Sequence, residues 1–432
     1  MENLSSYTIL FFFCGLIILS YLFSVINRAT RIPSVLLLLG TGILLRYLFG
    51  WAGSPFHIPP ALIEILGTIG LIMIVLEAGL DLEITRQKLP LIRSSFASAF
   101  IILLLSTFSV AGILQWWMPE TPFIHCVVYA IVLSIVSSAI VLPSVGHLND
   151  EKREFLIYEA SFSDVLGIMV FNFLTAGKAI TGQSVAWFFG SIPVAVVLSV
   201  FVCFALMLLL IKNRINVKFF LVFAVLIVIY VGGKMMYLPS LIAIMMFGLV
   251  VNNWELIRWK PLKNYFSNES VDDMAAFLKS ITAESSFLIR TFFFIIFGYS
   301  IDLASLQNPE VLKLGSAIVL ALLGLRFVYL RILHKYALFP ELFYIPRGLI
   351  TILLFYKIPE WVQTDTFDEG VLFFVILATS SIMMFGALFF NQFLAVCFDE
   401  GFARLRGVSV ETFYLLLLAL TALTVVVMVK VV

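Results

Sequence analysis

The segment FLIYEASFSDVLGIMVFNFL, residues 155–174, is apolar enough to cross a membrane but carries two carboxylates, Glu159 and Asp164. A charged side chain at the centre of a bilayer costs about 2.5–3.5 kcal/mol on insertion scales. Such a residue therefore persists where it is paired, faces a water-filled cavity or has a chemical role. Ser161 and Ser163 lie between the two acids. This stretch predicts a membrane helix that contains a polar site.

The composition extends this interpretation to the whole chain. Hydrophobic residues make up 62% and charged residues 12% of the 432 residues, whereas soluble domains have about 25% charged residues. Apolar runs recur along the entire length, so we expect an all-α polytopic membrane protein without a sizeable soluble domain. The net charge of +1 gives no reason to expect nucleic-acid binding. Widely spaced cysteines and histidines, and no nucleophile–base pair, favour neither a metal centre nor an enzyme.

The number of membrane spans follows from the apolar segments, since a helix needs about 20 apolar residues to cross the hydrocarbon core. The candidate spans are 7–26, 32–50, 61–80, 95–117, 123–146, 155–177, 185–211, 218–234, 237–252, 281–300, 310–330, 344–357, 369–395 and 410–430. Two of them are short, so the sequence predicts 13 or 14 transmembrane helices. The first span lacks a cleavage site and is expected to be retained.

Loop charges set the expected orientation. Most of the 27 lysines and arginines follow odd-numbered spans, whereas the loop at 359–370, PEWVQTDTFDEG, is acidic. The positive-inside rule therefore places the odd-numbered loops in the cytoplasm and, with 14 helices, both termini outside a plasma (inner) membrane. The long loop at 252–280 is expected to form in part an amphipathic helix on the cytoplasmic surface.

Two similar segments indicate an internal repeat. LIMIVLEAGLDLEIT (71–85) and FFFIIFGYSIDLASL (292–306) each run from an apolar stretch through Gly to Asp-Leu. Seven spans separate them, so they have opposite orientations, as inverted-topology repeats require. The expected division of the single domain 1–432 is a first half at 1–177, a linker helix at 185–211, a second half at 218–395 and an added helix at 410–430.

Each half contains a span that is expected to be interrupted: SIVSSAIVLPSVG at 134–146 and YIPRGLIT at 344–351. The residues that weaken a regular helix are Ser137, Ser138 and Pro143 in the first span and Pro346 and Gly348 in the second. Paired broken helices that cross in the membrane expose backbone groups and helix ends to an ion.

The inner acids predict a division of roles. Glu159 shares a helix face with Ser163, and Asp164 shares a neighbouring face with Ser161. We expect Arg347 to neutralise Glu159, which leaves Asp164 as the group that binds a proton or a cation. Carboxylate, hydroxyl and carbonyl oxygens suit Na⁺ or K⁺, whereas a transition metal would recruit His or Cys.

The other inner charges have weaker assignments. Glu77 either contributes a second carboxylate to the same cavity or faces cytoplasmic water. Glu284 and Arg290 are six residues apart, too far to pair along one helix, so we expect ion pairs with other helices that support the site from outside. Three further basic residues lie near span ends and are expected to reach the membrane surface: Lys234, Arg46 and Arg326.

Several motifs resemble the monovalent cation:proton antiporter superfamily over nearly the whole chain. EASFSD (159–164) is similar to its Glu-Ser-x-x-Asn-Asp signature, LIMIVLEAGLDLE to its third-helix motif and PRGLIT to its Arg-Gly motif. VSSAIVLPSV resembles the Kef-like branch, whereas Glu159 with Arg347 resembles the Nha-type exchangers.

The resemblance implies that Asp164 binds the ion and the proton, that Glu159 and Arg347 form a structural ion pair, and that Glu77 contributes to the cation site. It also implies elevator-like movement of a core domain against a dimerisation domain, a homodimer, and a role in pH homeostasis. Kef-like relatives often carry a regulatory cytosolic domain, so a separate regulatory subunit is a possible partner. No cofactor beyond the transported ions is expected.

The departures from the signature leave the ion open. Ser163 stands where the family has Asn, and Ala160 where it has Ser. Ser137, Ser138 and Ala139 replace the Thr-Asp-Pro that is often found in the Nha-type branch. Na⁺ is favoured, with K⁺/H⁺ exchange of the Kef-like type as the alternative. The single Asp after Ser163 favours electroneutral exchange. A cation channel and a membrane sensor that does not transport are the alternatives from other functional classes.

Overall fold

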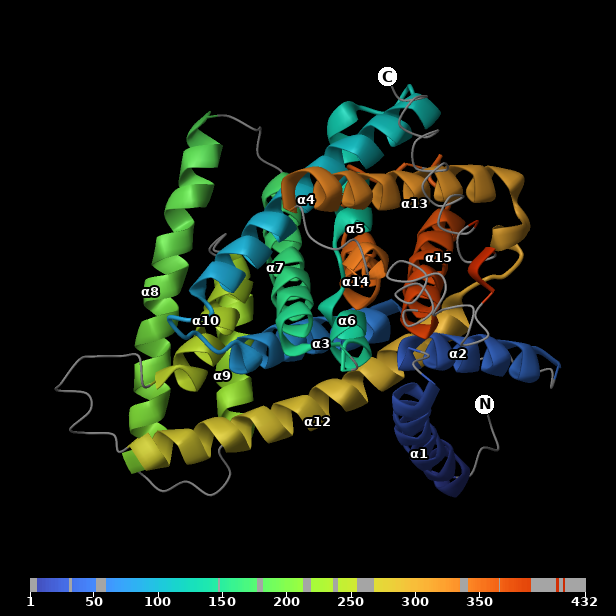
Figure 1. Cartoon of the computed structure of the whole chain (residues 1–432). Coiled ribbons are helices and arrows are strands. Elements are labelled where there is room, and N and C mark those ends of the chain that lie inside the picture. The colour runs from blue at the N-terminus through green and yellow to red at the C-terminus, as the bar shows by residue number, and fades with distance from the viewer. Residues whose placement is uncertain are drawn as a thin grey trace.

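The computed structural model describes residues 6–30, 33–51, 60–146, 148–176, 182–212, 219–235, 240–254, 268–334, 341–364, 366–389, 409–411 and 415 (Figure 1). These residues form helices and connecting loops and contain no strand. The all-α expectation is therefore confirmed for the described part of the chain.

The described residues of the first half of the chain form eight helices. They are α1 (Ser6–Thr30), α2 (Ser34–Trp51), α3 (Pro60–Asp81), α4 (Leu89–Trp117), α5 (Phe123–Ser134), α6 (Ser138–Ser144), α7 (Asp150–Leu174) and α8 (Gly182–Lys212). Because α5 and α6 are two parts of one predicted span, these helices correspond to the first seven spans.

The second half follows the same order. Its main helices are α9 (Phe219–Met235), α10 (Ser240–Asn252), α12 (Asn268–Ser300), α13 (Pro309–Tyr329), α14 (Leu349–Phe355) and α15 (Glu369–Leu388). Short helical turns are η2 (Ser305–Gln307), η3 (Leu330–His334) and η4 (Glu341–Phe343). The predicted span at 410–430 and residues 255–267 of the predicted surface helix lie almost entirely outside the described residues.

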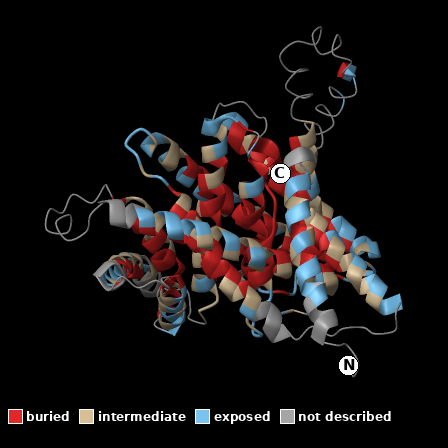
Figure 2. Cartoon of the chain, turned by 90° about the horizontal axis from the view of Figure 1, so that it is seen from below, coloured by how far each residue is buried: buried red, intermediate tan, exposed pale blue. Residues whose placement is uncertain are grey.

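Helix length and composition agree with a multi-pass membrane protein. Six of the described helical stretches are long and apolar enough to cross a membrane: 34–51, 89–117, 123–144, 273–300, 309–332 and 369–388. Buried residues concentrate in the middle of the helical assembly, and exposed ones lie mainly on its outer helices (Figure 2).

Contacts between loops support the predicted alternation of faces. On one face, three ion pairs join loops that follow odd-numbered spans: Lys88–Glu154, Lys152–Glu341 and Lys279–Asp81. On the other face, loops after even-numbered spans meet through Asn308 with Asp368, and the ring of His125 at the start of α5 lies near the ring of Trp361. Which face is cytoplasmic remains a prediction from the loop charges.

The expected repeat is visible in two equivalent close helix contacts. Gly79 of α3 packs on Gly248 of α10, and Gly298 of α12 packs on Gly42 of α2. A Cβ on any of the four would lie under 3.0 Å from a backbone carbonyl oxygen of the opposite helix, so only glycine allows this approach. Spans 3 and 9 thus repeat the contact of spans 10 and 2, as inverted halves require.

The helices pack as two groups, which we name the frame group and the core group. The frame group comprises α1, α2, α3, α8, α9, α10 and α12, and the core group comprises α4, α5, α6, α7, α13, α14 and α15. Helices α3 and α12 contact α14 across the boundary. The interrupted helices lie in the core group, near the centre of the assembly in Figure 1.

Candidate functional site

The predicted interruption of the fifth span is confirmed, but it lies before the proline. Helix α5 ends at Ser134 and α6 begins at Ser138, and the linking residues are extended, with φ/ψ of −69°/127° at Ile135 and −82°/115° at Ser137. Pro143 lies inside α6, so it does not form the break. The break therefore occurs at the serine-rich part of the motif.

The second interruption is also confirmed and crosses the first. Residues 344–348 are non-helical between η4 and α14, and the Ser137 N–H donates to the Pro346 carbonyl oxygen at 2.9 Å. A Cβ on Gly348 would lie 2.6 Å from the Ile140 Cδ1 atom and 2.8 Å from the Ser137 hydroxyl oxygen. Gly348 therefore permits the close crossing of the two segments.

The break frees three consecutive backbone N–H groups, and each has a different partner. Val136 N–H donates to the Ser163 hydroxyl oxygen at 3.0 Å, Ser137 N–H to Pro346, and Ser138 N–H to Asp164 Oδ2 at 3.0 Å. Backbone groups in a membrane interior must be satisfied within the protein, so these bonds hold the break open. Ser163 thus fastens α7 to the linking segment.

Asp164 lies at this crossing and is only 2% exposed. Its Oδ2 atom accepts from the Ser138 N–H, and the Ser138 side chain also bonds to the carboxyl group. Its Oδ1 atom has no hydrogen-bond partner among the described residues, and the same holds for the buried hydroxyls of Ser137 and Ser161. Two further buried hydroxyls, those of Thr351 on α14 and Ser380 on α15, likewise have no such partner, and no sequence motif indicated them as site residues.

Arg347 is at the crossing but does not pair with Glu159, so that prediction is wrong. Its Nε atom donates to the Leu133 carbonyl oxygen at 2.7 Å and its Nη1 atom to the Ile345 carbonyl oxygen at 3.1 Å. The Leu133 carbonyl belongs to the last turn of α5, where carbonyl groups have no partner within the helix. The guanidinium satisfies it and complements the negative helix end.

Glu159 instead forms a bidentate ion pair with Arg326 of α13, at 2.6 Å and 2.7 Å. Glu159 is 2% exposed and Arg326 0% exposed, and Ser98 of α4 also donates to Glu159. The expectation that Arg326 reaches the membrane surface is wrong. The helix continues through η3 to His334, so Arg326 lies well inside it. The signal that could have revealed this is Arg331, which is exposed and better placed for the surface.

Glu77 is turned toward α12 and is not joined to Asp164. It accepts from the Ser286 hydroxyl at 2.6 Å and forms an ion pair with Arg290 at 3.4 Å. The expected tertiary ion pair of Arg290 is thus confirmed, whereas Glu284 accepts a hydrogen bond from Tyr21.

Arg46 lies near the end of α2 and is partly exposed, in agreement with its expected place near a span end. It donates to the carbonyls of Ser300 and Ile301 at 2.9 Å each and pairs with Asp302, so it caps the end of α12. Lys234 lies in the last turn of α9, as expected for a residue near a span end.

The C-terminal part of the chain matches a second group of proteins. A family model described as ABC 3 transport family matches residues 366–432. A probable metal transport system membrane protein of Chlamydia trachomatis is 45% identical over 69 residues. That alignment covers 16% of this chain and 22% of the relative, so the chain spans less than a quarter of the relative's length.

Solved structures share the fold over almost the whole chain. Two structures of the sodium proton antiporter MjNhaP1 from Methanocaldococcus jannaschii match with TM-scores of 0.61 and 0.63 at 18% and 17% identity. They cover 91% and 90% of this chain, and 97% of each matched chain. At this identity the similarity concerns the fold.

The family follows from the match that spans both halves of the chain and both interrupted helices. The model described as "Sodium/hydrogen exchanger, transmembrane" matches residues 14–390. The chain therefore belongs to the transmembrane sodium/hydrogen exchanger family.

Proposed function

We propose that the chain exchanges Na⁺ for H⁺ by alternating access, with Asp164 as the shared binding group. The observation that carries this proposal is the buried Asp164 carboxyl at the crossing, whose Oδ1 atom has no hydrogen-bond partner among the described residues. A carboxylate oxygen in such a place binds a proton or a cation, and each excludes the other.

The surrounding oxygens suit a hard monovalent cation. The Ser137 and Ser161 hydroxyls are buried and lack partners in the described structure, and hydroxyl and carboxylate oxygens are ligands that Na⁺ and K⁺ accept. The Ser163 oxygen accepts from Val136 N–H, so it also holds the break in place. K⁺ is the alternative substrate, and a side-by-side comparison of the two ions decides between them.

Electroneutral exchange is supported by the pairing of the other two inner carboxylates. Glu159 is neutralised by Arg326, and Glu77 by Arg290. Asp164 forms no ion pair among the described residues. One proton and one monovalent cation that alternate on a single carboxylate leave the net charge moved per cycle at zero. We propose further that the chain acts as a homodimer in the inner membrane, without a cofactor or enzymatic activity.

The test is cation-driven dequenching of a pH-sensitive dye in proteoliposomes, with Na⁺ and K⁺ compared at several pH values. Asp164→Asn should abolish exchange. Asp150→Asn, an exposed residue at the start of the same helix, should retain it. Exchange by Asp164→Asn at the wild-type rate contradicts the proposal. Current without proton coupling would identify a channel instead, and no flux of either ion would favour a sensor.

A further inference from the structure

Two buried or half-buried side chains connect the core group to the frame group at different levels of the membrane. We propose that Tyr158 and Lys357 are positioning residues, each of which holds the Asp164 site closed toward one side of the membrane. This inference rests on the alternating access proposed above. It adds which residues control access from each side.

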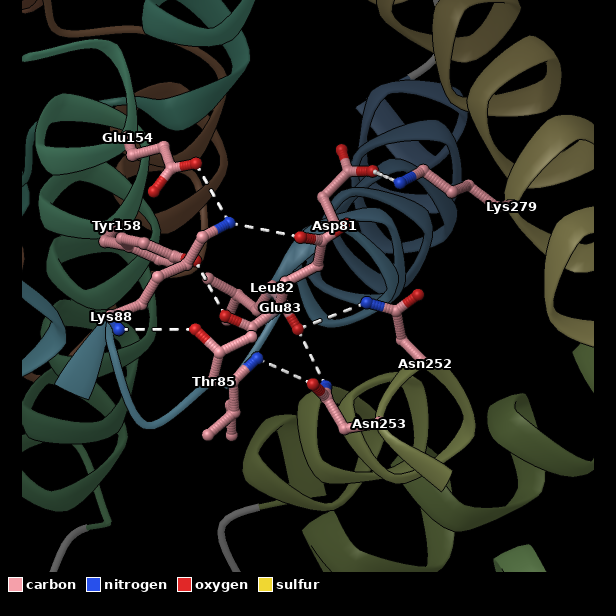
Figure 3. Close-up of polar contacts among 11 residues, drawn as sticks. Asp81, Leu82, Glu83, Thr85, Lys88, Glu154, Tyr158, Asn252, Asn253 and Lys279 are labelled. Atoms are coloured by element: carbon pink, nitrogen blue, oxygen red, sulfur yellow. Dashed lines mark hydrogen bonds and ion pairs between the residues drawn. The ribbon is translucent and has the colours of Figure 1, made fainter. Parts of the chain in front are cut away.

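The first contact depends on a short segment that is fixed to the frame group. After α3 ends, the Ile84 N–H donates to the Asn253 side-chain oxygen at 2.6 Å, and the Asn253 amide donates to the Leu82 carbonyl at 2.7 Å (Figure 3). Asn253 follows α10, so residues 82–84 are anchored to the frame group although they lead into α4.

Tyr158 of the core helix α7 binds this anchored segment. Its hydroxyl donates to the Glu83 carbonyl oxygen at 3.0 Å, and the side chain is 4% exposed (Figure 3). Lys88 reinforces the contact through ion pairs with Glu83 at 3.1 Å and Glu154 at 2.9 Å. The two carboxylates, Glu154 first, hold the pKa of Lys88 above its usual range, so Lys88 stays charged at physiological pH. Partly exposed ion pairs contribute little, so the buried tyrosine hydroxyl carries the contact.

The second contact lies toward the other end of α3. Lys357, just after α14, donates to the Thr68 hydroxyl at 2.9 Å and to the Tyr230 hydroxyl at 3.5 Å. Its ammonium also lies 5.9 Å from the centre of the Tyr230 ring. Thr68 belongs to α3 and Tyr230 to α9, both in the frame group. At a rise of 1.5 Å per residue, Thr68 lies roughly 20 Å along α3 from Asp81.

The two contacts therefore resist separation of the two groups at opposite sides of the site. Asp164 is 2% exposed while both contacts are made. Water and ions reach it from one side only when the core group separates from the frame group on that side, which breaks the contact there. Loss of one contact should favour opening on its own side and leave the other side unchanged.

The experiment measures access to the crossing from each side. Thr351, one turn beyond Gly348 and buried, is replaced by cysteine in a chain whose native cysteines are alanine. A membrane-impermeant maleimide is then added to vesicles of either orientation. Lys357→Met should raise the labelling rate about twofold to tenfold from the side of the 359–370 loop only, the shift expected when one hydrogen bond is lost. Tyr158→Phe should do the same from the opposite side only.

Matched controls remove similar contacts within the core group. Tyr129→Phe deletes an equally buried tyrosine hydroxyl that accepts from Thr364 N–H, and Lys152→Met deletes an ion pair to Glu341. Both variants should leave the ratio of the labelling rates from the two sides unchanged. Lys357→Arg should likewise leave this ratio at its wild-type value.

If Lys357→Met or Tyr158→Phe raised the labelling rate equally from both sides, or changed it from neither side, the inference would be overturned. Dye-based exchange by the unmodified chain in the same vesicles is a separate readout. Its absence would refute the proposed function, whereas exchange without a side-specific labelling effect would refute the inference alone.

Discussion

Replacement of Arg326 by methionine tests the ion pair that joins α7 to α13. The substitution leaves the Glu159 carboxylate, 2% exposed, with the Ser98 hydroxyl as its remaining hydrogen-bond donor among the described residues. Removal of one member of a buried pair destabilises a protein by about 3–5 kcal/mol because the remaining charge is uncompensated. We therefore expect a clear fall in the thermal unfolding temperature of the purified protein in detergent.

The double variant separates pairing from general damage. Arg326→Met together with Glu159→Gln should recover much of the stability that Arg326→Met alone loses. The coupling free energy between the two substitutions should exceed about 1 kcal/mol, because the effects of substitutions at two members of one ion pair are not additive. Arg347→Met with Glu159→Gln is the matched control, because Arg347 binds the Leu133 and Ile345 carbonyls instead. The effects of these two control substitutions on the free energy of unfolding should be additive within about 0.5 kcal/mol. Coupling of Glu159 to Arg347 and not to Arg326 would refute this assignment.

Three further predictions concern the crossing and the frame group. Gly348→Ala should slow exchange and cost about 1–3 kcal/mol through steric overlap, whereas Gly146→Ala, which has nothing within 4 Å, should behave as wild type in both assays. Arg347→Gln should lower the unfolding temperature and Arg347→Lys should restore part of it; equal loss in both variants would show that charge at the helix end is irrelevant. Glu77→Gln combined with Arg290→Met should leave the KM of exchange for the cation unchanged. A large rise in this KM would show instead that Glu77 contributes to the ion site.

Sequence patterns predicted those features of the fold that depend on local composition. Apolar run length located the spans, and the serines before Pro143 and the Pro346–Gly348 pair located both interruptions. Asp164 could be identified because a carboxylate in an apolar membrane helix costs insertion free energy, so it is retained where it is paired, hydrated or has a chemical role. The distribution of lysines and arginines also predicted which loops would meet on one face.

The arginine partners could not be predicted because pairing depends on how helices face one another. The apolar run predicts a span end close to Arg326, but η3 extends the helix past this residue and places it opposite Glu159. The motif pattern predicts Arg347 as the partner of Glu159, but Arg347 binds the Leu133 carbonyl oxygen at the end of α5 instead. Likewise, hydropathy does not reveal whether Glu77 faces Asp164 or, as the structure has it, α12.

Proton release on cation binding tests the central claim most directly. The purified wild-type protein in weakly buffered detergent solution, at a pH where Asp164 is protonated, should release about one proton for each Na⁺ or K⁺ bound, because ion and proton compete for one carboxylate. Asp164→Asn should neither bind the cation nor release a proton. Cation binding by Asp164→Asn with unchanged proton release would contradict the account.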